Sequence, residues 1–383
     1  MDFRDSPADA EFRAAARKVL EDAVAALPGA EPPTVEARLP WFRTFQQRIR
    51  DAGYAGLAWP QEYGGRDATL TEQAIFLQEY DRAGAPDRLN LLGEGLAGPT
   101  IIDFGSEEHK RRFLAPILGG DEIWCQLFSE PNAGSDLASL ETRAVRDGDG
   151  WRVTGQKVWT SRAQIASFGM LLARTGAPRH RGITYFLLPM DSEGITVRPL
   201  RHMLGEAEFN EVFLDDVFMP DDLRIGDVDG GWRIAMATLQ YERVALATGR
   251  VNVQRLANEL VRLVATTERD GRPLSEDTAV GRKVADLYAR AQVQRVNGLR
   301  ALSSLERGTP GPEASIGKLL SAPLVEDIAD FALSLAGLDG QLDEGELDPW
   351  LKLSYQARGT SIAGGTTFIQ RNIVAERVLG LPR

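Results

Sequence analysis

The most informative segment of the chain is Ser129-Glu130-Pro131-Asn132-Ala133-Gly134-Ser135-Asp136. Its small and polar residues leave backbone N–H groups free to point into a cavity, which suits an anionic or heteroaromatic ligand. The same composition is also typical of an ordinary surface loop. A second segment, Gly155-Gln156-Lys157-Val158-Trp159-Thr160-Ser161, follows downstream and places an aromatic ring and two hydroxyl groups at the end of a predicted strand. Trp159 taken alone is more typical of a core position than of a cofactor wall.

Three regions with different hydrophobic patterns follow one another along the 383 residues. Residues 1–120 carry apolar side chains at helical spacing and predict an all-α domain. Residues 121–228 contain a hairpin turn at Asp147-Gly148-Asp149-Gly150 and short apolar or alternating runs, which predict a β-barrel or β-sandwich. Residues 229–383 predict long helices in a four-helix bundle. We therefore predict a multidomain α and β protein. The predicted strands of its middle domain are 151–161, 182–188, 194–200 and 209–217.

Composition excludes several classes of protein. With 43% hydrophobic and 26% charged residues, the chain has the balance of a globular protein and not of a disordered one. A net charge of −11 argues against nucleic-acid binding. A single cysteine, Cys125, rules out a disulfide framework, and three widely separated histidines lack metal-ligand spacing. No segment approaches the ~20 apolar residues of a membrane span, and the N-terminus lacks a signal-type apolar core. We expect a cytoplasmic protein without a metal site.

Glu242 lies within a run of apolar residues at helical spacing. It follows Leu239 by three positions and precedes Leu246 by four, so it falls on the apolar stripe itself. A carboxylate in such a place loses hydration, which raises its pKa and makes it a candidate general base near neutral pH. The alternative is a structural ion pair with Arg243, Arg250 or another arginine. The stripe, predicted as one continuous feature, comprises Ala235, Leu239, Leu246, Val253, Leu256, Leu260 and Val264.

Two glycine-rich segments each allow two interpretations. Gly93-Glu94-Gly95-Leu96-Ala97-Gly98 matches the dinucleotide-binding pattern G-x-G-x-x-G. That pattern needs a preceding strand, and the helical surroundings here favour a connection between helices. The uncharged segment from Gly359 to Gln370 leads into a predicted helix with Thr366 or Thr367 near its N-cap. Free N–H groups there suit an anion or a flavin edge, and equally an ordinary helix start.

Taken in order, five segments resemble the acyl-CoA dehydrogenase family along nearly the whole chain. Residues 129–136 resemble its (T/S)EPxAGSD flavin loop, and residues 155–161 its GxKxW(I)(T/S) strand. Gly230-Gly231-Trp232 followed by Tyr241-Glu242-Arg243 resembles the opening of its C-terminal bundle. The other two segments are Gly56–Gly65 (GLAWPQEYGG), similar to its N-terminal helix connection, and Gly364–Arg383, similar to its closing segment. Each motif is moderately specific, and their common order makes them strong together.

The resemblance implies FAD bound between the β-domain and the bundle, next to a neighbouring subunit. Trp159 would flank the isoalloxazine ring, and Ser161 would hydrogen-bond near flavin N5. Arg269 would meet the FAD pyrophosphate in the partner subunit. The residues that the resemblance places at the cofactor are Phe128, Ser129, Gly134, Ser135, Trp159, Ser161, Arg269, Thr366 and Phe368. Those that it places at the acyl-CoA substrate are Ser135, Arg243 and Gly365.

Three positions depart from the family's pattern. The segment Glu268-Arg269-Asp270-Gly271 is shorter than the usual R-x-x-F-G and lacks its aromatic residue, and Phe368 replaces a residue that is often Gln or Glu. Gly364 stands where the family's commonest base, the Glu of an E-G-T triplet, is found. A minority branch, which includes isovaleryl- and long-chain-type enzymes, carries the base immediately before the arginine of the bundle helix. Glu242-Arg243 matches that branch.

The implied reaction is α,β-dehydrogenation of an acyl-CoA thioester in fatty acid or lipid catabolism. Glu242 would remove the α-proton, the β-hydrogen would leave as hydride to flavin N5, and electrons would pass to an electron-transfer flavoprotein. The family implies a homo-oligomer, a dimer or tetramer. Two rivals stay open: a non-catalytic subunit of a mixed oligomer, and an oxygen-using flavin oxidase or monooxygenase on the same fold. Ala363 and Gly364 replace a tyrosine and a glutamate of many straight-chain members, which predicts a branched, cyclic or otherwise bulky acyl group.

Overall fold

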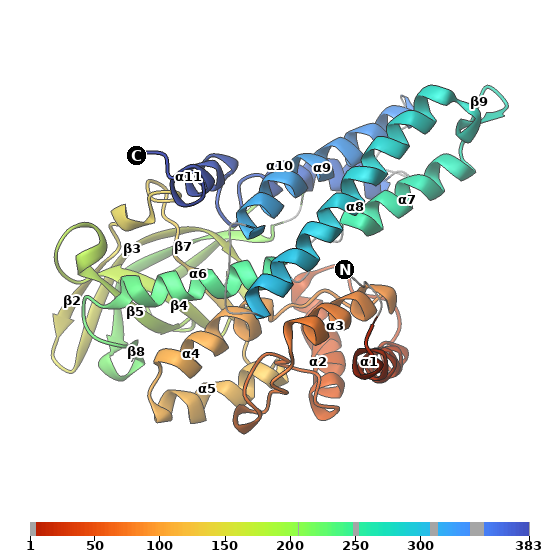
Figure 1. Cartoon of the computed structure of the whole chain (residues 1–383). Helices are drawn as coiled ribbons and strands as arrows, with labels where there is room; N and C mark the ends of the chain where they lie inside the picture. Colours follow the sequence, from red (N-terminus) through yellow and green to blue (C-terminus); the bar gives the residue numbers. More distant parts are fainter. Residues whose placement is uncertain (1–4, 206, 248–252, 307–312, 338–347, 383) are drawn as a thin grey trace. The chain divides into compact units, whose positions relative to one another are not determined.

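The computed structural model describes residues 5–205, 207–247, 253–306, 313–337 and 348–382 (Figure 1). The chain divides into two compact units, residues 1–242 and 243–383. The first unit contains the N-terminal helices and the sheet, and the second contains further helices. The predicted order of helices, sheet and helices is confirmed, whereas the domain boundaries near residues 120 and 228 stay a prediction.

Polar caps begin the helices of the first unit. Ser6, Thr34, Thr69 and Ser106 each accept a hydrogen bond from the backbone N–H three residues ahead. Each cap satisfies a donor that the first helical turn leaves without an intrahelical partner. The helices are α1 (Pro7–Ala25), α2 (Val35–Asp51), α3 (Leu70–Arg82), α4 (Gly98–Phe104) and α5 (Glu107–Gly119).

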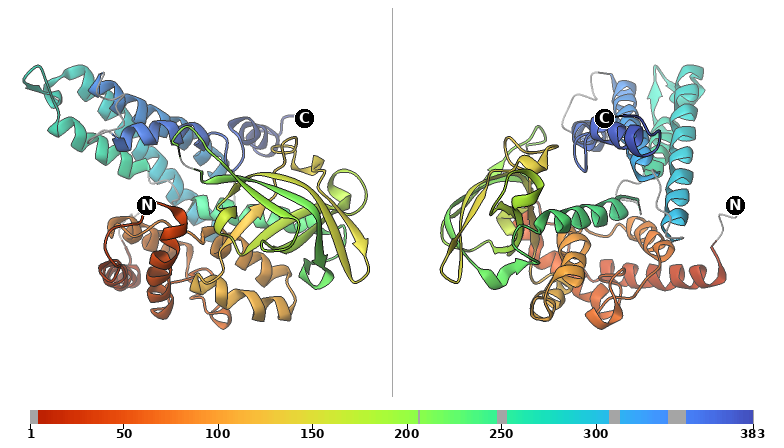
Figure 2. Two further views of the ribbon diagram at one scale, coloured as in Figure 1. Left: turned by 180° about the vertical axis from the view of Figure 1, so that it is seen from behind. Right: turned by 60° about the vertical axis from the view of Figure 1, so that its left-hand side comes forward.

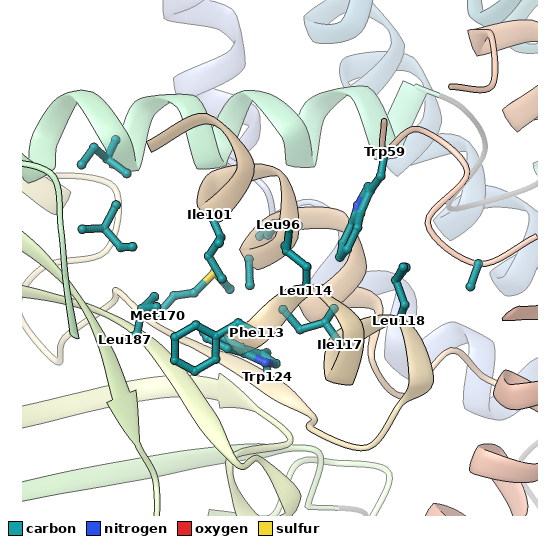
Figure 3. Packing of buried hydrophobic residues seen from close by; sticks show 14 of the residues in the cluster. Trp59, Leu96, Ile101, Phe113, Leu114, Ile117, Leu118, Trp124, Met170 and Leu187 are labelled. Atoms are coloured by element: carbon teal, nitrogen blue, oxygen red, sulfur yellow. The ribbon is translucent and has the colours of Figure 1, made fainter. Parts of the chain in front are cut away.

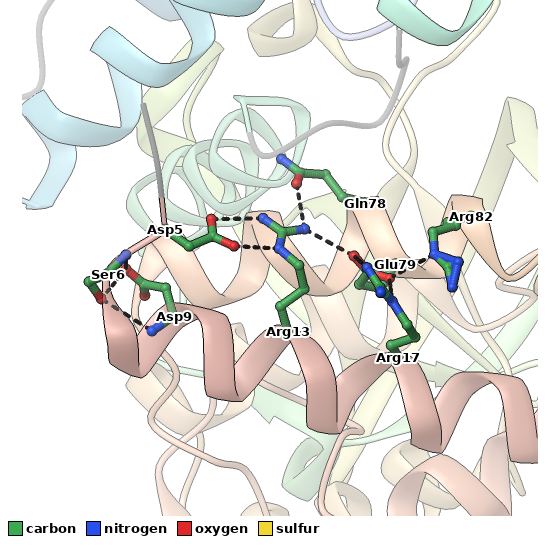
Figure 4. A network of polar contacts seen from close by, with 8 residues as sticks. All are labelled: Asp5, Ser6, Asp9, Arg13, Arg17, Gln78, Glu79 and Arg82. Atoms are coloured by element: carbon green, nitrogen blue, oxygen red, sulfur yellow. Dashed lines mark hydrogen bonds and ion pairs between the residues drawn. The ribbon is translucent and has the colours of Figure 1, made fainter. Parts of the chain in front are cut away.

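One buried carboxylate joins α1 to α3 (Figure 4). Glu79 of α3 is 3% exposed and accepts from Arg13 and Arg17 of α1 at 3.0 and 2.8 Å. Arg82 of its own helix adds a third contact at 3.3 Å. Burial by itself would raise the pKa of Glu79, but the arginines outweigh it and hold the pKa below its ordinary value. Glu79 is therefore ionised and fastens α1 to α3.

The G-x-G-x-x-G pattern lies in a π-helical turn, Gly93–Ala97, that runs directly into α4. The described residues before it, 83–92, contain no strand, so the pattern forms a connection between helices and not a dinucleotide-binding turn. Gly98 is required by a close approach, because a Cβ there would lie 1.9 Å from the ring of Trp59. The Trp59 indole N–H in turn donates to the carbonyl of Glu94 at 2.9 Å. Figure 3 shows the Trp59 ring against this segment.

The middle strands form one eight-stranded sheet with the order β6-β7-β3-β2-β4-β5-β8 and with β1 beside β4. β1 (Trp124–Leu127) runs parallel to β4, and the predicted hairpin at Asp147–Gly150 joins β2 to β3. Figure 2 shows that the sheet is strongly curled. The other strands are β2 (Arg143–Asp147), β3 (Gly150–Ser161), β4 (Phe168–Arg174), β5 (Ile183–Pro189), β6 (Ile195–Leu200), β7 (Phe209–Pro220) and β8 (Arg224–Ile225). The four predicted strands correspond to β3, β5, β6 and β7.

Alternate side chains of β1 enter two different cores. Trp124 joins the core beneath the helices, where its ring packs edge-on against Phe113 of α5 with centroids 5.5 Å apart (Figure 3). Cys125 and Leu127 point to the opposite face and join the core within the curled sheet. The strand is therefore held from both sides, and the loop that follows it starts from a rigid point.

Four helices of the second unit share one apolar core, as expected of a bundle. Leu260, Leu287, Ile328 and Ala357, one from each helix, are almost fully buried in it. The helices are α7 (Val253–Thr266), α8 (Thr278–Glu306), α9 (Glu313–Ala336) and α10 (Asp348–Thr360). A hairpin of β9 (Glu268–Arg269) and β10 (Arg272–Pro273) follows α7, and α11 (Thr367–Arg377) ends the unit. The sequence did not predict α10.

The apolar stripe predicted as one feature belongs to two helices. α6 (Gly231–Ala247) contributes Ala235 and Leu239 to the core of the first unit. α7 contributes Val253 and Leu260 to the core of the second. The prediction of one continuous stripe was wrong. Helical spacing indicates that a helix buries one face, but it does not indicate what that face packs against.

Membrane-crossing helices and metal centres are both absent from the described part of the chain. No described helix combines the length and the apolar character that a bilayer crossing needs. In the same residues, no three His, Cys, Asp or Glu side chains lie close enough together to hold an ion. Cys125 is buried, and burial raises the pKa of its thiol, so the group is not a nucleophile at neutral pH.

Candidate active site

Residues 129–136 form a tight loop directly after β1. Glu130 and Ala133 exchange two backbone hydrogen bonds of 3.0 and 3.1 Å, which fold the loop back on itself. The carbonyl of Ser129 accepts from the N–H of Val158 in β3 at 3.0 Å. These bonds join the two segments that the sequence singled out, so they form one local structure.

The loop has a buried base and an exposed tip. Phe128, at the base, is 4% exposed and packs edge-on against Tyr185 of β5. Gly134 and Ser135, at the tip, are exposed. A Cβ built on Gly134 would meet no atom within 4 Å, so open space lies above the backbone there. A flat or anionic group can therefore approach the backbone closely at the tip.

A buried ion pair clamps the loop to β3. Lys157 is fully buried, and its Nζ donates to the Glu130 carboxylate at 2.8 Å and to the carbonyl of Phe128 at 3.2 Å. The same carboxylate accepts from the backbone N–H groups of Glu141 and Thr142 at 2.6 and 2.9 Å. Each charge thus faces an opposite charge and has at least one further backbone partner, which is the condition for burying it.

The pair is ionised at neutral pH. Burial would raise the pKa of Glu130, but Lys157 and the backbone donors outweigh it and hold the pKa below its ordinary value. Burial lowers the pKa of Lys157 to about 8, with Glu130 opposing the change. The sequence motifs did not predict this pair. A charged residue within each of the two segments was the available signal, because a buried charge needs a partner.

Trp159 projects from a bulge in the pairing of β3 with β7. Its backbone φ is +60°, a conformation that costs a non-glycine residue on the order of 1 kcal/mol, and its side chain is 64% exposed. The ring meets Phe209 edge-on, with centroids 5.9 Å apart. Trp159 is therefore not a core residue. A large aromatic ring that a strained backbone exposes to water fits the wall of a ligand site.

Several polar atoms around the bulge are available to a ligand. The hydroxyls of Ser129, Ser135 and Ser161 have no hydrogen-bond partner among the described residues. The Oγ1 of Thr160 also has no partner in this part of the chain, but it is buried and therefore not open to a ligand as the serine hydroxyls are. The exposed ring, the open loop tip and these hydroxyls fit a planar heteroaromatic group with hydrogen-bonding edges, such as the isoalloxazine of FAD.

Glu242 lies on the buried face of α6. It follows Ala235 by seven residues and the fully buried Thr238 by four, so all three share one side of the helix. Its own side chain is half-buried. The predicted position on an apolar face is confirmed up to this residue. The side chains of Arg243 and Leu246, and all of Arg250, lie outside the described residues.

In the second unit, the glycine-rich segment starts a helix as predicted. Thr366 is the N-cap of α11, and its hydroxyl accepts from the N–H of Ile369 at 3.2 Å. Gly364 and Gly365 precede it with φ of +66° and +91°, a conformation that L side chains rarely adopt. Phe368, in the first turn, is 73% exposed.

Arg269 is exposed and lies in the β9–β10 hairpin. Its guanidinium donates to the carbonyl of Leu335 at the end of α9 at 2.8 Å. The structure therefore brings together the cofactor candidates of the first unit around the loop and the bulge, and Glu242 lies on α6. Gly365, Thr366 and Phe368 lie together at the start of α11, and Arg269 lies elsewhere in the second unit.

Comparisons with known proteins match nearly the whole chain. Family models described as acyl-CoA dehydrogenase N-terminal, middle and C-terminal domains match residues 6–121, 125–217 and 229–379. The acyl-CoA dehydrogenase IpdE1 of Mycobacterium tuberculosis is 41% identical over 97% of this chain and 98% of its own length. Two solved structures, the ChsE4-ChsE5 complex from the same organism and the Tcur3481-Tcur3483 steroid ACAD, are each 30% identical over the full length of both chains, with TM-scores of 0.87 and 0.86. The chain therefore belongs to the acyl-CoA dehydrogenase family of FAD-binding oxidoreductases, which act on CH–CH bonds.

Proposed function

We propose that this chain converts an acyl-CoA thioester to its trans-2-enoyl-CoA, with Glu242 as the catalytic base. The observation that carries the proposal is the place of Glu242 on the buried face of α6, at the position that the minority branch of the family uses for its base. A carboxylate held on such a face lies on a fixed element, from which it can act as a general base on a bound substrate.

We assign FAD to the site around the loop and the bulge. Trp159 would lie against the isoalloxazine ring, and Ser161 and Ser129 would hydrogen-bond to its polar edge. Phe128, Gly134 and Ser135 would complete the wall. From the family resemblance we also assign Thr366, Phe368 and Arg269 to FAD binding. When bound, FAD accepts the β-hydrogen as a hydride.

The protein's own part in the chemistry is to orient the substrate and move one proton. The free N–H groups and the Ser135 hydroxyl at the loop tip would bind the thioester, with Arg243 and Gly365 on the substrate side. A hydrogen-bonded thioester carbonyl makes its α-carbon more acidic. Glu242 then removes the α-proton and holds it on its carboxyl group.

Two finer proposals follow from the sequence and the relatives. Ala363 and Gly364 lack the bulk found at their places in many straight-chain members, which favours a branched, cyclic or otherwise bulky acyl group, and a relative described as a steroid ACAD supports this. The ChsE4-ChsE5 relative is a complex of two chains, which supports a mixed oligomer as an alternative to a homodimer or homotetramer. An electron-transfer flavoprotein as acceptor and a cytoplasmic location stay expectations from the sequence.

The decisive experiment replaces Glu242 by Gln, which keeps size and hydrogen bonding but removes the proton acceptor. Substrate-dependent bleaching of the flavin should fall ~10²–10⁴-fold, while FAD stays bound. Glu108→Gln, on the exposed side of α5, is the matched control and should bleach at the wild-type rate. Full activity in Glu242→Gln would end the assignment, and a loss of stability instead of rate would favour a structural ion pair.

The same preparation separates the two rival functions. A colourless protein that takes up no FAD when purified alone would support a non-catalytic subunit of a mixed oligomer. Rapid reaction of the reduced flavin with oxygen would support an oxidase or monooxygenase. A yellow protein whose reduced flavin reacts slowly with oxygen agrees with a dehydrogenase.

A further inference from the structure

The helix that carries Glu242 is tied to α4 by side-chain contacts within the first unit. Two of these contacts, Thr238 with Thr100 and Tyr241 with Asp103, have the same spacing, because the two residues on each helix are three positions apart. One contact alone would leave α6 free to rotate about it, whereas two at successive turns fix its rotation. The contacts are Arg233 over the ring of Phe104 at 5.3 Å, Thr238 Oγ1 to Thr100 Oγ1 at 2.8 Å, and the hydroxyl of Tyr241 to the carboxylate of Asp103.

The inner contact is a buried cluster of hydroxyl groups. Thr238 and Thr100 are 0% and 1% exposed, and Thr238 Oγ1 also lies 3.5 Å from the hydroxyl of Tyr185. Thr238 donates back to the carbonyl of Ile234 at 3.0 Å. Hydroxyls in an apolar core are costly unless they are paired, so this cluster specifies how α6 and α4 meet.

The outer contact lies next to the proposed base. Tyr241 is half-buried and directly precedes Glu242, whereas Asp103 is exposed. Burial, and then the neighbouring Asp103, raise the pKa of Tyr241, so its hydroxyl stays protonated and donates. Because Asp103 faces water, the bond can be removed without leaving an unpaired group in the core. The contact can therefore be tested separately from the stability of the fold.

The rotation of α6 determines where the Glu242 carboxylate lies. Successive residues of a helix are about 100° apart, so Glu242 lies about 40° around the axis from Thr238 and about 100° from Tyr241. A side-chain end about 5 Å from the axis moves about 2 Å when the helix turns by about 20°. A displacement of about 1 Å at a reacting group can already lower a rate by about 10²-fold.

We propose that Tyr241, held by Asp103, is a positioning residue that fixes the orientation of the Glu242 carboxylate. This role rests on the proposed function, because it presupposes that Glu242 is the base. Tyr241 does not touch the reacting atoms. It acts by preventing the turn of α6 that carries Glu242 from rotating about the Thr238–Thr100 contact.

The test compares Tyr241→Phe, Asp103→Ala and the double variant in the flavin-loaded protein. Octanoyl-CoA and cyclohexane-1-carbonyl-CoA serve as probes, and rates are expressed per bound flavin. Each single variant should lower kcat about 10- to 100-fold with KM within about threefold, and the double variant should be no slower than either. Deuterium at the α-carbon should slow the variants more than the wild type, because proton removal has become the slow step. Asp103→Asn keeps an acceptor and should restore most of the rate.

A second measurement needs no substrate. Amide hydrogen exchange across residues 238–242 should quicken in Tyr241→Phe, with the melting temperature within about 3 °C of wild type. Tyr63→Phe is the matched control, because its hydroxyl accepts from Lys110 of α5, and it should change neither the rate nor the exchange.

The outcomes separate this role from the proposed function. If Glu242→Gln is inactive but Tyr241→Phe and Asp103→Ala keep the wild-type kcat, isotope effect and amide exchange, the positioning role is overturned and the base assignment stands. A change confined to KM, or single-variant losses that add up in the double variant, would also overturn it. If Glu242→Gln is fully active, both proposals fall together.

Discussion

Replacing Lys157 by Met tests the clamp beneath the loop. Methionine keeps the length and the apolar stem of the lysine but removes the ammonium, so the buried Glu130 carboxylate keeps only its bonds to the N–H groups of Glu141 and Thr142. Removing one partner of a buried pair costs about 3–5 kcal/mol. Because two backbone donors stay in place, we expect the lower end, about 3 kcal/mol. For a unit of this size that lowers the melting temperature by about 6–12 °C.

The loss should depend on pH in a way that identifies its cause. In the wild type the pKa of Glu130 is below its ordinary value of 4.5, so its contribution is present above that value and disappears as the pH falls through the lowered pKa. In Lys157→Met burial acts without the counter-charge, so the pKa of Glu130 rises and folding is weakened as the pH rises through it. The difference between the two proteins should therefore be largest at neutral pH and shrink toward pH 4.

The assay is thermal and urea unfolding of the flavin-loaded protein between pH 4 and pH 8, with flavin content measured alongside. Glu130→Gln combined with Lys157→Met removes both charges and should recover most of the stability. Lys18→Met is the matched control, because Lys18 forms an exposed pair with Asp22, and its loss should stay below about 0.5 kcal/mol. A melting temperature of Lys157→Met within 2 °C of wild type at pH 7 would refute the reasoning.

Three further changes give sharp outcomes. Trp159→Ala should weaken FAD retention through lost ring contact, and Trp159→Gly should weaken it equally. The glycine variant should be about 1 kcal/mol more stable than the alanine variant, because glycine accepts a φ of +60°. Equal stabilities of the two variants on urea unfolding would contradict backbone strain at this position. Gly98→Ala would place a Cβ 1.9 Å from the Trp59 ring and should lower the free energy of unfolding by about 1–3 kcal/mol. Its control, Gly281→Ala in open space on α8, should be neutral or stabilising. A Gly98→Ala variant as stable as the wild type would disprove the close approach. Glu79→Gln should lower the free energy of unfolding by about 3 kcal/mol at pH 7. Because the arginines lower the pKa of Glu79, this loss should fade as the pH drops below 4.5, the ordinary pKa of the group. A loss that is constant with pH would exclude the ion pairs as its cause.

The sequence predicted features whose causes lie within a few residues. Helical spacing, the Asp147–Gly150 turn and the Thr366 cap all depend on neighbouring side chains and backbone torsions, and the structure contains each of them. The ordered motifs indicated the family for a related reason, since each is a short stretch that a ligand or a turn constrains directly. The position of Glu242 on an apolar face followed from spacing alone.

Only the tertiary structure decided which faces meet. The spacing of apolar residues could not show that the apolar stripe is divided between α6 and α7. Each helix buries one face, and no neighbouring residue in the sequence identifies the surface against which that face packs. The Glu130–Lys157 clamp joins residues 27 positions apart, and the Tyr241–Asp103 contact joins residues 138 apart. Trp159, typical of a core residue by its type, is exposed because a bulge turns its backbone outward. The sequence by itself thus determined most helices, four strands of the sheet and the candidate groups. Long-range packing alone determined how those groups are held, because contact energies depend on neighbours that the chain brings together only when it folds.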